Sequence, residues 1–120
     1  MRRIYRNVTI DLATGALGNS QPFNGVDRGN VVGFSTTVIG TRPQKSVRVV
    51  LEVNSNHIGD PIDINFTETK GRASFEDSII PINYNDPGSI GAKILLDEAV
   101  ATGEDFSVEV MLVIEQECNV

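Results

Sequence analysis

The side chains best suited to catalysis in this chain are one histidine and one cysteine. His57 and Cys118 are the only residues of their types, so a nucleophile paired with a base would have to use one of them. His57 lies in a polar segment between two predicted strands, and Cys118 lies close to the C-terminal end. No serine has the surroundings of a nucleophile elbow. The sequence therefore predicts no catalytic residue and no enzymatic activity.

Carboxylates offer the remaining chemistry. They gather in three predicted loops, around Asp60 and Asp63, around Asp86, and at Glu104 and Asp105. Calcium takes oxygen ligands from loops of this composition. The spacing matches no EF-hand, however, and Asp is a normal turn residue for reasons of backbone conformation. We predict no metal site and no cofactor, and leave open whether one of these loops binds calcium.

The elements that would position these side chains are predicted to be β-strands, because apolar residues recur at every second position. This alternation predicts about eight strands, over residues 4–12, 32–38, 47–53, 62–66, 73–76, 79–83, 90–96 and 106–114. The last has the longest unbroken alternation and is expected to be a central strand. A single helical turn is possible at residues 98–101. The pattern predicts an all-β fold, an antiparallel β-sandwich of jelly-roll or Ig-like type.

Length and composition indicate one domain. The chain has 120 residues, of which 40% are hydrophobic and 22% charged, enough for one core and too few for two. We therefore expect a single β-sandwich domain over residues 1–120. No apolar segment is long enough to span a membrane, and the N-terminal residues lack the apolar region of a signal peptide. We expect no membrane association, no secretion signal and synthesis in the cytoplasm.

One segment, residues 13–30, departs from the regular spacing. It contains four glycines and shows no sustained period, and loops of this length in a compact domain often carry function. Leu17, Phe23 and Val26 are apolar enough to anchor the segment on the domain or on a neighbour. We interpret it as a long loop or arm.

The charge distribution is uneven along the chain. The net charge is −6, with seven basic and four acidic residues in positions 1–60 and three basic and twelve acidic residues in positions 61–120. Chain ends that meet in space and neutralise each other would explain this asymmetry, as would a charged partner surface. The bases form no continuous stripe, so we expect no binding to nucleic acid.

Apolar residues also occur on the predicted outward faces of the strands. Val50, Met111 and Val113 alternate against the core stripe of their strands, and outward apolar residues that cluster mark a protein contact. We therefore predict an interface and expect a homo-oligomer. The predicted interface residues are Arg2, Arg3, Arg6, Phe23, Val26, Val50, Met111 and Val113.

The overall style resembles small virion proteins of tailed bacteriophages. The shared features are an intact Met1, an acidic β-rich chain with loops rich in Gly and Asn, a basic N-terminal strand and no catalytic set. The resemblance, to capsid decoration, head-fibre and baseplate-type β-sandwich proteins, implies a structural component of a virion. Its partners would be other copies of itself, for example in a trimer, and other virion proteins.

A carbohydrate-binding β-sandwich module is the alternative. Such a module would need aromatic side chains grouped on a groove or at a loop end. The chain has no tryptophan. The available aromatic residues, Tyr5, Phe23, Phe75 and Tyr84, are widely spaced in the sequence.

Overall fold

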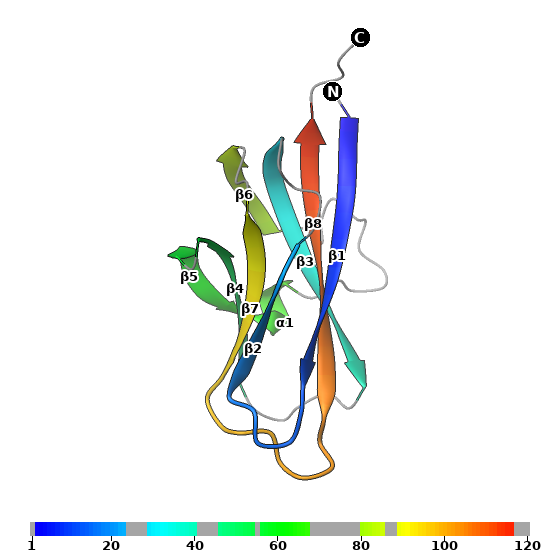
Figure 1. Ribbon diagram of the computed structural model, residues 1–120, viewed down its shortest axis with the longest axis vertical. Coiled ribbons are helices and arrows are strands. Elements are labelled where there is room, and N and C mark those ends of the chain that lie inside the picture. Colours follow the sequence, from blue (N-terminus) through cyan, green and yellow to red (C-terminus); the bar gives the residue numbers. More distant parts are fainter. Residues whose placement is uncertain are drawn as a thin grey trace.

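The structure, a computed structural model, describes residues 2–23, 29–40, 46–54, 56–67, 80–85 and 89–116. Eight strands form two antiparallel four-stranded sheets that pack on each other as one β-sandwich (Figure 1). Sheet A has the order β1 (Arg2–Leu12), β8 (Phe106–Gln116), β3 (Asn30–Gly40), β6 (Ile80–Asn85). Sheet B has the order β2 (Gly18–Pro22), β7 (Ile90–Leu96), β4 (Val47–Val53), β5 (Asn56–Asp63). The predicted all-β sandwich is confirmed.

The strand pairing is nested. β1 pairs with β8, β2 with β7, β3 with β6 and β4 with β5. Successive pairs alternate between sheets A and B. This is the connectivity of a jelly roll, and it decides between the two topologies that the sequence left open. It also brings the two ends of the described chain side by side in sheet A (Figure 1).

The core lies between the sheets and is centred on β8. Its inward residues Val108, Val110, Leu112 and Ile114 are all fully buried. β8 has β1 on one side and β3 on the other, so the prediction of a central strand is confirmed. Burial of these large apolar side chains supplies the main stabilisation of the fold.

The structure differs from the sequence expectation in three places. The segment 13–30 is not a loop throughout, because β2 forms within it. β5 begins at Asn56, so His57 lies in a strand. The alternation of Ile62, Ile64 and Phe66 does not continue as a strand, since residues 64–67 form the one-turn helix α1 (Ile64–Thr67).

Two further expectations concern the helix content and one predicted strand. Residues 98–101 contain no helical turn. The predicted strand at 73–76 lies outside the described residues. In the described part of the chain, no helix is long and apolar enough to cross a membrane.

Side-chain hydrogen bonds hold α1 against the sandwich. The Asp63 carboxylate accepts a bond from the Asn65 N–H at 2.9 Å and so caps the start of the helix. The Thr36 and Thr67 hydroxyl groups lie 2.8 Å apart, and both side chains are buried. The Thr67 hydroxyl also lies 3.3 Å from the Ile64 carbonyl oxygen, to which it can donate. A helix too short to be stable alone is thus joined to β3.

Loss of either threonine hydroxyl is expected to destabilise the protein, because it removes the buried hydrogen bond between Thr36 and Thr67. We expect Thr36→Val and Thr67→Val each to lower the free energy of unfolding by about 1–3 kcal/mol. The double variant should lose clearly less than the sum of the two, because the hydrogen bond between the two hydroxyls can be lost only once. Urea unfolding of the wild type and the three variants measures this. Strictly additive losses would show that the two hydroxyls do not interact.

The edge strands carry features that discourage pairing with other chains. Three of the four contain a proline, namely Pro22 in β2, Pro61 in β5 and Pro81 in β6. Proline removes a main-chain donor and is typical of sheet edges. Pro81 fits this pattern, since β6 is an edge strand of sheet A. The fourth edge strand, β1, contains no proline.

Candidate protein-binding surface

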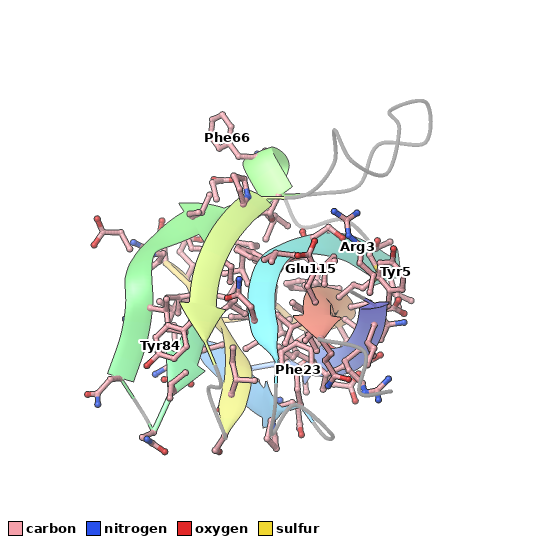
Figure 2. The ribbon with its side chains drawn as sticks, turned by 90° about the horizontal axis from the view of Figure 1, so that it is seen from above. Arg3, Tyr5, Phe23, Phe66, Tyr84 and Glu115 are labelled. Carbon is pink, nitrogen blue, oxygen red and sulfur yellow. The ribbon has the colours of Figure 1, made fainter. Side chains whose placement is uncertain are left out.

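The basic residues predicted at the interface lie on β1, at one edge of sheet A. Arg3 is opposite Glu115 of β8 in the strand register, and its Nε lies 3.4 Å from Glu115 Oε1. The Arg6 guanidinium donates to the Tyr5 carbonyl oxygen at 3.3 Å. The backbone of Arg2 is part of β1, while its side chain lies outside the described part of the structure. Figure 2 shows Arg3, Tyr5 and Glu115 together at this edge.

Phe23 is part of the domain core. It follows β2, is buried between the sheets and packs within the hydrophobic core. Its N–H donates to the Ile90 carbonyl oxygen at 2.8 Å, which extends the pairing of β2 with β7. Phe23 therefore anchors the 13–30 segment on this domain. Val26 lies outside the described residues.

The three outward apolar residues do not form one patch. Val50 lies on the outer face of sheet B, while Met111 and Val113 lie on the outer face of sheet A. Val50 and Val113 are only 2% and 0% exposed, and Met111 is half-buried. Alternation along a strand predicts the face on which a side chain lies. It does not predict whether other residues cover that face. The prediction of exposed apolar side chains is therefore wrong for Val50 and Val113.

The exposed apolar side chains are others. Tyr5, Leu17, Ile39 and Phe66 are between 46% and 77% exposed. Tyr5 lies on the outer face of β1 beside the Arg3–Glu115 pair, as Figure 2 shows, and Phe66 projects from α1. The position of Tyr5 follows from the alternation of β1 and could have been found in the sequence. That of Phe66 could not, because it depends on the helical turn.

The aromatic residues considered for sugar binding do not form a platform. Phe23 is buried, and Phe75 lies outside the described residues. Tyr5 and Tyr84 belong to β1 and β6, the two opposite edges of sheet A (Figure 2). Tyr84 also packs against the core. The described aromatic residues therefore do not share one binding face.

The histidine and the carboxylates have structural surroundings. His57 faces Glu52 across the β4–β5 pair, with Nε2 3.9 Å from Glu52 Oε2. Asp63 caps α1, and Asp105 accepts a hydrogen bond from the Thr14 hydroxyl at 2.6 Å. Asp86 lies outside the described residues. Within the described parts of the chain, no three His, Cys, Asp or Glu side chains lie close enough to hold a metal ion.

A group of basic residues and a group of acidic residues lie at opposite ends of the sandwich. Arg2, Arg3 and Arg6 lie at the start of β1, next to the end of β8. Asp97, Glu98, Glu104 and Asp105 lie in the β7–β8 connection at the other end of the sandwich (Figure 1). Ion pairs of Arg3 with Glu115, and of Arg48 with Asp97 at 3.1 Å, join the basic first half of the chain to the acidic second half. The uneven charge of the sequence is thus partly neutralised in space.

No family model matches this chain, and no curated protein matches it. A solved structure does. The chain is similar in structure to the Yersinia pseudotuberculosis-derived mitogen, with a TM-score of 0.50 and 13% sequence identity. The match covers 97% of this chain and 90% of the mitogen chain. At this identity the likeness establishes a shared fold.

The match contradicts the interpretation of this chain as a bacteriophage virion protein, since the similar structure is that of a bacterial mitogen. The expected location in a virion and the expected contacts with other virion proteins are corrected with it. The expected homo-oligomer rested on outward apolar residues, of which Val50 and Val113 are buried, and it is not carried further. The resemblance had rested on charge, composition and strand content, which unrelated small β-sandwich proteins share.

Proposed function

We propose that this chain is a non-enzymatic, mitogen-like protein that acts outside the cell that makes it, by binding a protein on the surface of a host immune cell. The observation that carries this proposal is the match to the mitogen structure over 97% of this chain and 90% of the other. The two chains thus share one sandwich fold over nearly all of their length.

The outer face of sheet A beside β1 is the proposed contact surface. Tyr5 is 46% exposed there, and aromatic residues with a polar tip are common at the centres of protein interfaces. Arg3 and Met111 lie on the same face, Arg3 exposed and Met111 half-buried. Arginine, methionine and tyrosine are the residue types enriched in such contacts. Of the residues predicted from the sequence, Arg3 and Met111 lie on this outer face and are retained in this proposal.

Stimulation of human mononuclear cells tests the function. We expect the purified chain to raise DNA synthesis in these cells in a dose-dependent way, and Tyr5→Ala to reduce the effect at least tenfold at equal protein concentration. Tyr84→Ala, at the opposite edge of sheet A, is the matched control. Circular dichroism confirms that each variant is folded. A folded wild-type chain that stimulates no cells would refute the proposal.

A further inference from the structure

β1 is an edge strand of sheet A, and it differs from the other three edge strands because it contains no proline. β1 pairs with β8 over Arg2–Leu12 with no shift in register. A long, regular edge strand presents main-chain N–H and C=O groups on which another strand can pair. β1 is therefore the edge best shaped to accept an added strand.

Two side-chain contacts show which main-chain groups of β1 face this edge. The Asp11 carbonyl oxygen accepts a bond at 2.8 Å from Asn19 Nδ2. Asn19 lies on β2 in the other sheet, whereas β8 is the partner of β1 within sheet A. The Tyr5 carbonyl oxygen accepts from Arg6 Nη1. Tyr5 and Asp11 are an even number of residues apart, so their main-chain groups point the same way.

The main-chain groups of Asn7 and Thr9, between these two residues, point the same way again. In an antiparallel ladder, the N–H and C=O of one residue face the same neighbouring strand, and successive residues alternate. Both Asn7 and Thr9 are exposed. An incoming strand would pair with these two residues.

The side chains around this segment define the chemistry of the occupant. Arg6 lies on the inner parity of β1, opposite Leu112, yet it is only half-buried and its guanidinium reaches back to the edge. Tyr5 lies on the outer face and is 46% exposed. A strand added here would place one row of side chains beside the Arg6 cation and the other row beside the Tyr5 ring.

We propose that the edge of β1 at residues 7–9 binds an acidic, extended segment of a partner protein as a fifth strand of sheet A. Charge complementarity selects this occupant: Arg2 and Arg6 give the start of β1 positive charge, while the whole chain carries −6 and repels acidic partners elsewhere. If two copies of β1 paired antiparallel about Asn7, Arg6 of one copy would lie opposite Val8 of the other. Arg6 would then have no carboxylate opposite it. The inference deepens the proposed binding function and rests on it for the kind of partner.

Amide hydrogen exchange measures the site directly. In the free chain we expect the Asn7 and Thr9 amides to exchange rapidly, and the Val8 and Ile10 amides, which face β8, to exchange slowly. The probe is a ten-residue peptide of alternating valine and glutamate. Its addition at millimolar concentration should slow exchange at Asn7 and Thr9 at least tenfold and leave Val8 and Ile10 unchanged. The even-numbered residues are thus an internal control.

Matched peptides and variants test the charge and the main-chain pairing separately. A peptide with lysine in place of glutamate should bind at least tenfold more weakly, and so should the acidic peptide to Arg6→Glu. Lys93→Glu, which changes the charge on sheet B by the same amount, should bind like the wild type. Asn7→Pro removes one edge donor and should abolish binding. If that variant folds poorly, the wild type can be tested with a peptide that is N-methylated at alternate residues. This removes the peptide's own main-chain donors and should also abolish binding.

Several results would overturn the edge site. They are equal binding of the acidic and basic peptides, binding that survives in a folded Asn7→Pro variant, or no slowing of exchange at Asn7 and Thr9. Protection of these two amides in the free chain, together with dimerisation in light scattering, would instead assign the edge to a second copy and refute the proposal. Because the peptide assay uses no cells, its failure is distinct from a failure to stimulate cells.

Discussion

Leu112→Ala is expected to lower the free energy of unfolding by about 2–5 kcal/mol, because it leaves a cavity in the most tightly enclosed part of the core. Leu112 is 0% exposed on the central strand β8. In the strand register it lies between Arg6 of β1 and Phe34 of β3, which both belong to continuous strands. The surrounding backbone is therefore held from two sides and has little freedom to collapse into the cavity.

Urea unfolding followed by circular dichroism measures this loss. Met111→Ala is the matched control, since Met111 is the preceding residue on the same strand, faces outward and is half-buried. We expect the control to lose less than about 1.5 kcal/mol. Similar losses for the two variants would contradict the assignment of Leu112 to the core and of Met111 to the outer face.

The fold class could be predicted because strands that bury one face show apolar residues at every second position of the sequence. In β8, β4 and β7, inward residues such as Val108, Val49 and Ile94 alternate with polar or partly exposed ones. This period of two is a direct consequence of strand geometry. Where inward apolar residues alternate along a whole strand, as in β8, β4 and β7, the sequence alone locates it.

β2 could not be predicted, because its sequence carries no apolar stripe. Its residues Gly18–Pro22 are almost all exposed. The strand forms because its main chain pairs with that of β7. Gly18 permits the close approach, since a Cβ there would lie 2.5 Å from the Ile94 carbonyl oxygen. Pairing of this kind is a tertiary effect that overrides local propensity.

α1 could not be predicted because, unlike β2, its sequence has the apolar alternation that is typical of a strand. Ile62, Ile64 and Phe66 keep a period of two, but the Asp63 cap and the buried Thr67 hydroxyl favour a helical turn. Both of these interactions depend on neighbours that the sequence does not reveal. The exposure of Phe66 follows from that turn.

The candidate site was only partly accessible to sequence reasoning. The basic character of β1 is visible in Arg2, Arg3 and Arg6. That Arg3 meets Glu115, however, is a result of the nested pairing, in which the first strand joins the last. Strand order is decided by contacts between distant segments, so the arrangement of charges on the folded surface could not be predicted from local patterns.

Val113 distinguishes a residue that supports the sandwich from one that offers a contact surface. It lies on the outer face of sheet A, between Tyr5 and Gly33 in the register, yet is 0% exposed. A carboxylate placed there would be buried, and Arg3 on the same face already pairs with Glu115. We therefore expect Val113→Asp to lower the free energy of unfolding by about 3–5 kcal/mol at neutral pH. Met111→Asp, two residues earlier on the same face, should lose less than about 1.5 kcal/mol, since its side chain can reach water.

The pH dependence separates charge burial from loss of packing. Burial disfavours the ionised form and raises the pKa of the introduced carboxyl in the folded state above its unfolded value. The folded state then binds more protons, so the penalty of Val113→Asp relative to the wild type should shrink as the pH falls towards 4. Val113→Ala, which removes packing without adding charge, should show a penalty independent of pH. A Val113→Asp variant as stable as Met111→Asp at neutral pH would show that Val113 is open to solvent, and would return it to the residues available for binding.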